Sequence, residues 1–311
     1  MEDLYAGYDL KTHVKKLAQA DAKYVAAVRS DLAKFGYAHI PNVVKAPEVA
    51  EILSSFKEWQ AATPQLQSLH PLISQHGIYK HGAAGQQRHA WLTRTNADVL
   101  DLFKLLYGKE LVSSMDGSCY IAGARKRESC WTHTDQSPFT RGEQCFQGLV
   151  SLTRNEECTF TLYRGSHLLH EKYFRERVDD DPKWKKNFQL IDPAFLETIR
   201  HTYMRVAVEP GDVILWDSRL FHQNAYGSKE EERIVQYVAF MPRGDPRNTS
   251  AIQKKRRQYF EEGRTTSHRP FPIQVNGLQP QTYGDDSRLV DYEALPAPRL
   301  EDLMPKIRAL L

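Results

Sequence analysis

The stretch Trp131-Thr132-His133-Thr134-Asp135 places an imidazole and a carboxylate two residues apart in a segment typical of a β-strand. Alternate side chains of a strand point to the same side, so His133 and Asp135 can face one metal ion. A second imidazole, from His222 on a partnering strand, would complete a set of two histidines and one carboxylate. Such a set covers one face of an octahedron, suits non-haem Fe(II) and leaves the remaining positions open.

A candidate anion site lies eleven residues after His222, where Arg233 begins the apolar strand predicted over Ile234–Phe240. A buried arginine is costly unless it meets an anion, and its planar fork suits a carboxylate. The distal carboxylate of 2-oxoglutarate would fit this position. The alternative is a structural pair with an Asp or Glu at the end of the strand.

The first third of the sequence is predicted to be mainly helical, because apolar residues recur at spacings of three, four and seven. One helix runs from Leu17 to Phe35 and ends at Gly36, and a strand follows over Tyr37–Val44. A second helix begins near Pro47, and a third follows the potential N-cap Asn96. The glycine- and histidine-rich residues 77–85 are predicted to form a loop.

Short strand-like segments with turn residues between them dominate after residue 110, which favours an antiparallel sandwich or barrel over a βαβ series. Residues 168–200 resemble an insertion with helical parts, and Lys254–Gly263 and Arg299–Leu311 are predicted helices. We expect a single domain over 1–311, with a mostly helical part (1–110), a core (111–242) and a C-terminal wrap (243–311). The predicted strands are Leu111–Ala124, Cys130–Asp135, Gln147–Leu152, Thr159–Tyr163, Tyr203–Val208, Asp212–Trp216 and Arg233–Phe240.

These motifs, in this order and spacing, resemble the phytanoyl-CoA dioxygenase-like branch of the Fe(II)/2-oxoglutarate-dependent oxygenases. The resemblance covers roughly residues 34–242. It is carried by His133-Thr134-Asp135-Gln136, Gln147-Gly148-Leu149-Val150, Arg164-Gly165-Ser166-His167, Gly211-Asp212-Val213, Asp217-Ser218-Arg219, His222 and Arg233.

The resemblance implies a mainly β fold with flanking helices, a double-stranded β-helix or jelly roll. It also implies Fe(II) bound by His133, Asp135 and His222, 2-oxoglutarate as cosubstrate anchored by Arg233, and O2 as the oxidant. Further candidates for the cosubstrate pocket are polar residues of the same region: Asn224, Gln147 and, less directly, Lys80. His167, within the Gly-Ser-His turn, is not expected to be a ligand.

Two features bear on the reaction that the resemblance implies. The family's usual proline before Gly-Ser-His is Arg164 here, which would alter that turn or project a charge toward the mouth of the site. Because the carboxylate of Asp135 is present, halide binding at the metal is disfavoured, and hydroxylation of a small molecule is the expected reaction. The loop Gly263–Pro270 could line the substrate mouth, where its arginines would favour an anionic or polar group, or could dock a tail on the barrel.

Two other functions stay open: a catalytically inactive jelly-roll protein that binds a ligand, and a cupin-like enzyme with another metal such as zinc. The second leaves Arg233 unexplained. With 42 basic and 39 acidic residues alternating along the chain, no nucleic-acid partner is expected. The sequence has no apolar run of about 18 residues and no signal peptide or C-terminal peroxisomal signal, so we expect a cytoplasmic protein without membrane contact. Reduced thiols are expected for Cys119, Cys130, Cys145 and Cys158, and the oligomeric state is unknown.

Overall fold

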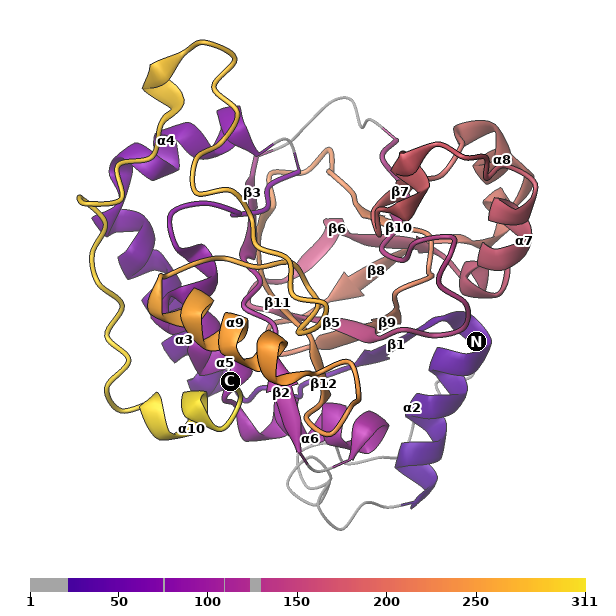
Figure 1. The fold of residues 1–311 in the computed structure, drawn as a ribbon, viewed down its shortest axis with the longest axis horizontal. Coiled ribbons are helices and arrows are strands. Elements are labelled where there is room, and N and C mark those ends of the chain that lie inside the picture. The colour runs from indigo at the N-terminus through magenta and orange to yellow at the C-terminus, as the bar shows by residue number, and fades with distance from the viewer. Residues whose placement is uncertain (1–21, 75, 109, 124–129) are drawn as a thin grey trace.

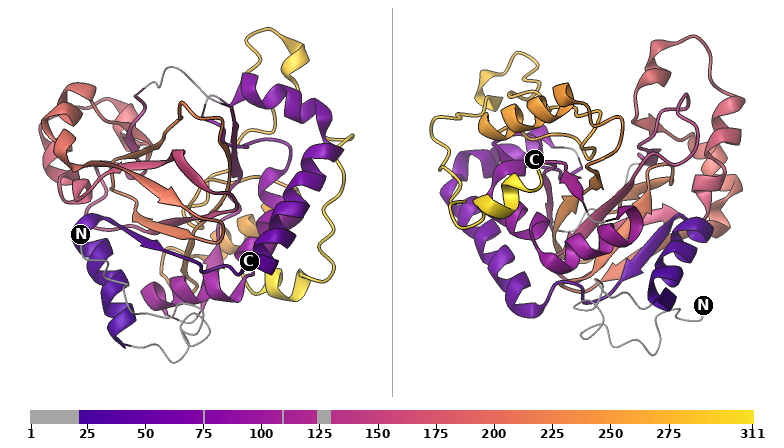
Figure 2. Two further views of the ribbon diagram at one scale, coloured as in Figure 1. Left: turned by 180° about the vertical axis from the view of Figure 1, so that it is seen from behind. Right: turned by 60° about the horizontal axis from the view of Figure 1, so that its bottom comes forward.

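Two five-stranded antiparallel sheets form the centre of the molecule in the computed structural model, which describes residues 22–74, 76–108, 110–123 and 130–311 (Figures 1 and 2). The first sheet has the order β1-β9-β5-β11-β3, and the second has the order β7-β4-β10-β6-β8. Apolar side chains of both sheets meet in one cluster, in which Leu149 and Ile214 face Phe160 and Val206. The fold is the expected jelly roll with flanking helices.

Both faces of the first sheet are covered, so its strands contribute buried residues to both sides. On the face away from the second sheet, Phe56, Trp91 and Phe103 from three helices join Leu215 and Val238 in the largest core cluster. The strands are β1 (Tyr37–Ile40), β2 (Leu111–Ser113), β3 (Ser118–Ala122), β4 (His133–Thr134), β5 (Phe146–Ser151), β6 (Asn155–Tyr163), β7 (Gln189–Leu190), β8 (Tyr203–Val208), β9 (Val213–Asp217), β10 (His222–Asn224), β11 (Glu232–Val238) and β12 (Phe240–Pro242).

The helices flank the sheets, and the N-terminal ones lie against the first sheet while the chain from 168 to 202 lies beside the second (Figure 1). The α-helices are α2 (Ala22–Phe35), α3 (Ala46–Ala62), α4 (Pro64–Ile73), α5 (Arg88–Arg94), α6 (Ala97–Tyr107), α7 (His170–Arg175), α8 (Pro193–Thr198), α9 (Ser250–Glu261) and α10 (Met304–Arg308). Shorter 3-10 turns are η2 (Ala84–Gln86), η3 (Ser166–Leu168), η4 (Pro182–Lys185), η5 (Arg200–Thr202) and η6 (Asp286–Arg288).

Several elements predicted from sequence are confirmed. Helix α2 ends directly before Gly36, although the predicted start at Leu17 lies outside the described residues. Helix α6 begins after Asn96, whose side chain accepts hydrogen bonds from the backbone nitrogens of Asp98 and Val99. The insertion 168–200 contains α7 and α8, and α9 covers most of the helix predicted near residue 254.

Other predicted elements are shorter than expected. The strand predicted over Tyr37–Val44 ends at Ile40, and the strand predicted over Cys130–Asp135 is reduced to β4. The last helix covers only Met304–Arg308 of the predicted Arg299–Leu311. Helices α4 and α5 and the short strand β7 were not predicted. The single domain with its three parts stays a prediction. Among the described residues, no helix is both long and apolar enough to cross a bilayer.

The largest departure lies at residues 114–117, which separate β2 from β3 where one continuous strand was predicted. Here the backbone leaves the sheet, and the backbone N–H of Met115 donates to Thr266 Oγ1 at 2.9 Å. Two glycines allow close backbone contacts. A Cβ on Gly85 would overlap the carbonyl oxygen of Met115, and a Cβ on Gly117 would overlap that of Tyr79. The segment is therefore fixed by tertiary contacts, not by strand pairing.

We predict that Gly117→Ala destabilises the protein by about 2 kcal/mol, because the added methyl group must displace backbone and cannot be accommodated by a side-chain rotation. Urea unfolding followed by circular dichroism measures the change. Gly244→Ala is the matched control, since no atom lies within 4 Å of its Cβ position and its free energy of unfolding should change by less than about 0.5 kcal/mol. Equal effects of the two substitutions would contradict this account of the break.

Candidate metal centre

The three predicted metal ligands meet at one end of the second sheet. His133 lies on β4, Asp135 directly follows this strand, and His222 begins β10. The two histidines are direct partners across the antiparallel β4–β10 pair. One ligand atom from each of the three residues lies within 4.8 Å of the others, and all three side chains are buried. The predicted strand spacing therefore brings these residues together, although Asp135 lies just beyond the strand end.

Hydrogen bonds fix which ring nitrogen of each histidine carries the proton. Nδ1 of His133 lies 3.1 Å from the carbonyl oxygen of Trp131, and Nδ1 of His222 lies 2.9 Å from that of Leu220. A carbonyl oxygen only accepts, so in the neutral rings Nδ1–H donates and Nε2 keeps its lone pair. The Nε2 atoms lie 3.6 Å and 3.3 Å from the carboxylate oxygens of Asp135. In these neutral tautomers, three electron-pair donors face one another.

The electrostatics of the cluster favour the protonation states that a metal requires. Burial, with help from the neighbouring His222, lowers the pKa of His133 to about 3. Burial alone would raise the pKa of Asp135, but the imidazoles of His268, His133 and His222 hold it well below its ordinary value. Neutral imidazoles beside an ionised carboxylate are the forms that bind a cation directly.

Gln147 on β5, predicted as a residue of the cosubstrate pocket, contacts the metal-ligand residue Asp135. Its Nε2 donates to Asp135 Oδ2 at 3.1 Å, which fixes the orientation of the carboxylate. The backbone N–H of Asp135 donates to the carbonyl oxygen of Ser218 at 2.9 Å, so main chain and side chain are both held. Gln147 also lines the cavity, where it remains a candidate for contact with the cosubstrate.

A cavity of about 540 Å³ opens over the cluster and has His133, Asp135 and His222 in its wall. Its mouth carries aromatic side chains. The rings of His76 and Trp131 stack with centroids 3.7 Å apart, and the ring of Trp131 lies 4.8 Å from that of His133. This volume falls within the range of small-molecule sites.

Arg233 is buried on β11, with only 1% of its surface exposed. Its Nη1 donates to Cys119 Sγ at 2.9 Å, and the Tyr237 hydroxyl lies beside the guanidinium. Nε and Nη2 are buried and have no hydrogen-bond partner among the described residues. No Asp or Glu within the described chain forms an ion pair with it, so the structural alternative considered from sequence lacks a partner.

Asn224 connects the region of Arg233 to the metal-ligand cluster, which is the group formed by His133, Asp135 and His222. It lies on β10 two residues after His222, and its Nδ2 donates to the Tyr237 hydroxyl at 2.9 Å. Asn224 and Tyr237 both line the cavity. Asn224 and Tyr237 thus link the predicted anion site at Arg233 to the cavity wall that also contains the predicted metal ligands.

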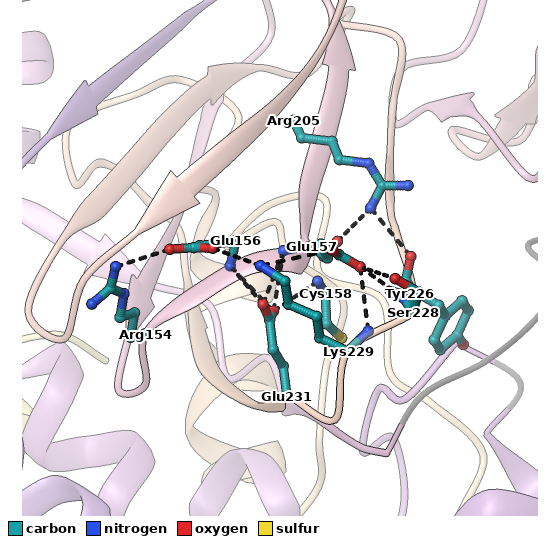
Figure 3. A network of polar contacts seen from close by, with 9 residues as sticks. All are labelled: Arg154, Glu156, Glu157, Cys158, Arg205, Tyr226, Ser228, Lys229 and Glu231. Atoms are coloured by element: carbon teal, nitrogen blue, oxygen red, sulfur yellow. Dashed lines mark hydrogen bonds and ion pairs between the residues drawn. The ribbon is translucent and has the colours of Figure 1, made fainter.

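The loop that joins β10 to β11 is held by a network of charged residues at the start of β6 (Figure 3). The Glu231 carboxylate accepts from the backbone nitrogens of Glu156, Glu157 and Cys158 at 2.9 to 3.3 Å. Glu157 Oε2 in turn accepts from the backbone N–H and the hydroxyl of Ser228, both at 2.7 Å. The loop, residues 225–231, lies within the eleven-residue step from His222 to Arg233, so the network helps to fix their separation.

The remaining residues singled out from sequence lie in different places. Lys80 is exposed and lines the mouth of the cavity. Nε2 of His167 contacts the carbonyl oxygen of Ala33 at 3.0 Å, away from the metal cluster, as expected for a turn residue. Arg164 lies over the Phe35 ring at 5.1 Å and does not project toward the mouth. No disulfide joins Cys119, Cys130, Cys145 or Cys158.

Three cavity residues were missed as site residues. His268 lines the cavity with a buried Nε2 that has no hydrogen-bond partner in the described chain, and burial lowers its pKa to about 4. Asp116 and Tyr237 also line the cavity, and burial raises the pKa of Asp116 to about 7. The Asp116-Gly117 dipeptide is a turn signal inside the predicted strand and could have indicated the break.

Comparison with known proteins agrees with this site. The family model described as phytanoyl-CoA dioxygenase (PhyH) matches residues 32–226, which is more than half of the chain. The chain belongs to the phytanoyl-CoA dioxygenase family. The metal-ligand cluster lies within the matched residues, whereas Arg233 and His268 follow them.

Individual relatives of this phytanoyl-CoA dioxygenase family member are distant. A curated relative, "Ava biosynthesis cluster protein O" of Aspergillus versicolor, is 27% identical over 186 residues, which cover 56% of this chain and 60% of that relative. The epimerase SnoN, solved with Fe3+, alpha ketoglutarate and nogalamycin RO, is 18% identical, with 71% of this chain and 85% of that chain covered and a TM-score of 0.48. EctD from S. alaskensis, solved with 2-oxoglutarate and 5-hydroxyectoine, is 17% identical, with coverages of 71% and 76% and a TM-score of 0.49.

We predict that His133 makes the metal-free protein less stable in acid. Its pKa is near 6.5 when unfolded and about 3 when folded, so below pH 6.5 the unfolded chain binds the extra proton. This contribution to the free energy of unfolding is fully present above pH 6.5 and falls by about 1.4 kcal/mol per pH unit as the pH drops toward 3. His133→Ala should therefore flatten the pH dependence of stability between pH 6.5 and 4.5.

Urea unfolding at several pH values in the presence of a chelator measures this slope. The control is His201→Ala, because His201 is exposed and its replacement should leave the slope unchanged. The raised pKa of Asp116 changes stability with pH in the opposite direction. Its contribution is the same in wild type, His133→Ala and His201→Ala, so it cancels when their slopes are compared. Parallel curves for wild type and His133→Ala would show that His133 is not held neutral by burial.

Proposed function

We propose that this protein is an Fe(II)- and 2-oxoglutarate-dependent dioxygenase that hydroxylates a small molecule. One observation carries the proposal. Nε2 of His133, Nε2 of His222 and the carboxylate of Asp135 converge within 4.8 Å, and all three are electron-pair donors in the neutral tautomers that the Nδ1 hydrogen bonds favour. Such an arrangement is repulsive unless a cation occupies its centre.

The donor set fits iron. Two imidazoles and one carboxylate on one side of a metal are typical of non-haem Fe(II) oxygenases and leave the remaining positions for other ligands. Here those positions face the cavity, because all three residues belong to its wall. When bound, the iron together with 2-oxoglutarate and O2 would supply the oxidising chemistry, which no side chain of the protein can provide.

The arginine fits the cosubstrate. Arg233 brings a positive charge and two unpaired N–H groups into a buried position beside Asn224 and Tyr237. A carboxylate would accept hydrogen bonds from Nε and Nη2 side by side, which is the bidentate geometry that arginine favours. A cation at this position, or an empty site, would leave Nε and Nη2 of Arg233 buried without hydrogen-bond partners.

The chain itself orients and shields the reacting groups. The Nδ1–H groups of both histidines donate to backbone carbonyls, so the rings cannot turn away. Gln147 holds Oδ2 of Asp135. The rings of Trp131 and Phe188 lie beside His133, with the Phe188 centroid 4.6 Å from that of His133, and they limit the access of water.

The two alternatives explain less of the structure. A catalytically inactive binding protein has no use for three converging electron-pair donors. A zinc enzyme could use these donors, but it would leave the unpaired nitrogens of Arg233 without a role. The carboxylate of Asp135 occupies the position that halide-binding relatives leave free, which disfavours halogenation and leaves hydroxylation as the default reaction of this chemistry.

Anaerobic titration tests the proposal. We predict that metal-free protein given Fe(II) and then 2-oxoglutarate develops the weak visible charge-transfer band of the chelate, and that His133→Ala and Asp135→Ala abolish it together with iron-dependent succinate formation. Circular dichroism verifies that the variants are folded, and His201→Ala serves as the control histidine substitution. A folded wild-type protein with bound iron and no band would refute the assignment.

For Arg233→Ala, we predict an increase of about 100-fold in the 2-oxoglutarate concentration that half-saturates the band, because two hydrogen bonds to a charged group are lost. Arg233→Lys should recover part of the loss, since it keeps the charge without the fork. Fe(II) affinity, measured separately by calorimetry, should stay within about threefold of wild type, because the arginine is not a metal ligand. Equal loss of iron and cosubstrate binding would indicate a structural arginine.

A further inference from the structure

A hairpin near the C-terminus forms one wall of the cavity. Residues 265–276, here called the C-terminal hairpin, are joined by an antiparallel bridge between Thr266 and Val275. The backbone N–H of Ser267 donates to Gln274 O at 2.8 Å, and that of Asn276 donates to Thr265 O at 3.0 Å. The family match ends at residue 226, so the whole hairpin lies outside it.

The hairpin is fixed to the core at several points. The Thr265 hydroxyl accepts from the backbone N–H of Gly85 at 3.0 Å. Thr266 exchanges two hydrogen bonds of 2.9 Å with the backbone of Met115. Arg269, which is only 4% exposed, donates to the carbonyl oxygen of Asp135. The hairpin is therefore positioned relative to the metal-ligand cluster by direct bonds.

Neutral polar side chains of the hairpin face the cavity. Ser267, His268, Gln274 and Asn276 all belong to its wall. The buried Nε2 of His268 has no partner among the described residues, so it is available to a bound molecule. His268 also lies close enough to Asp135 to influence the pKa of its carboxyl group, which places it beside the metal-ligand cluster.

The arginines of this region do not face the cavity, although the sequence favoured an anionic group here. Arg264 donates to Asn276 O at 2.9 Å and pairs with Glu262 at 3.7 Å. Arg269 is buried against the backbone of Asp135. Neither guanidinium belongs to the cavity wall, so neither supports an anionic substrate, and within the described chain Lys80 is the cationic side chain that remains there.

A carboxyl group faces the same space from the break between β2 and β3. Asp116 lines the cavity, and its backbone carbonyl accepts hydrogen bonds from both Arg94 and Gln236. Its side chain accepts one from the backbone N–H of Gly117 at 2.8 Å. Within the described chain, the polar wall thus combines a firmly positioned carboxyl group with neutral acceptors.

Another part of the cavity wall is aromatic and apolar. The stacked rings of His76 and Trp131 lie there together with Phe188, which is 49% exposed, and Ile73 and Ile78. Flat side chains stacked in this way offer a face to another flat group. The cavity therefore has one wall suited to a ring and another suited to hydrogen bonding.

We propose that the C-terminal hairpin and Asp116 form the recognition wall for a substrate with a flat apolar ring system and a hydrogen-donating N–H or O–H group, neutral or cationic. The ring would lie on the Trp131 side, and the donor group would reach Asp116 and Nε2 of His268. This inference rests on the proposed function for the role of the cavity. It disfavours acyl-CoA thioesters and other anionic substrates, for which this wall presents no guanidinium.

Ligand-observed saturation-transfer NMR with three naphthalene probes tests the proposal on the full chain. The probes share one ring and differ at one group: 2-(aminomethyl)naphthalene, 2-naphthalenemethanol and 2-naphthoate. We expect the amine to bind severalfold more tightly than the alcohol, because it adds an ionic contact with Asp116, and both to bind at least tenfold more tightly than the carboxylate. Coenzyme A should not displace them. Asp116→Asn should remove the advantage of the amine over the alcohol, and His268→Leu should weaken the alcohol severalfold.

Matched controls are Asp286→Asn and His201→Leu, which alter exposed residues and should preserve the order of affinities. Tighter binding of naphthoate, displacement by coenzyme A, or an unchanged order in both Asp116→Asn and His268→Leu would overturn the proposal. Saturation transfer requires no metal, so recognition is measured independently of iron. Added Mn(II) should broaden the probe signals in wild type. If the probes bind in the expected order of affinity but Mn(II) does not broaden their signals, the result would support the recognition wall and contradict only the proposed metal site.

Discussion

The antiparallel pairing of His133 with His222 is the constraint on which the site depends. Strands β4 and β10 have only two and three residues, yet their register places the two imidazoles directly opposite each other. On its other side β10 pairs with β6, where His222 lies opposite Leu162, so its orientation is set from both edges. A shift of one residue would turn each imidazole to the opposite face of the sheet. Asp135 lies beside both imidazoles, with Gln147 bonded to it, only while this register holds.

The site also contains two sets of charged or polar groups whose electrostatic partners the protein itself does not supply. Three electron-pair donors face one another at the metal centre, and a guanidinium with two unpaired nitrogens lies buried at Arg233. Burial of such groups without partners lowers stability, because they lose hydration and gain nothing in return. The two sets require partners of opposite sign, one a cation and one an anion, and Asn224 and Tyr237 lie between the two places. Binding of both would relieve the cost and stabilise the fold, as any ligand specific for the native state does.

The sequence indicated the metal ligands, the arginine and the fold class because these depend on local spacing. Residues two apart share a face of a strand, and eleven residues suffice for a turn between neighbouring strands. The break at 114–117 and the C-terminal hairpin were not predicted, since both depend on contacts between distant segments, such as Met115 with Thr266. No local periodicity marks such contacts. For the same reason, Asp116 was assigned to a continuous strand. The sequence also left open whether the arginines at 264 and 269 line the mouth or dock a tail, whereas both bond internally.

The location of the C-terminal hairpin has a consequence for how the protein can change over time. The metal-ligand cluster is encoded between residues 133 and 222, whereas the hairpin that faces it is encoded some forty residues later. Because the hairpin is attached mainly through backbone atoms and two threonines, the side chains at 267, 268, 274 and 276 can vary without disturbing its attachment. The hairpin part of the proposed recognition wall and the candidate metal ligands are thus encoded on separate stretches of the chain. Substitutions at these four positions could redirect the oxidation to new molecules while the metal centre stays intact.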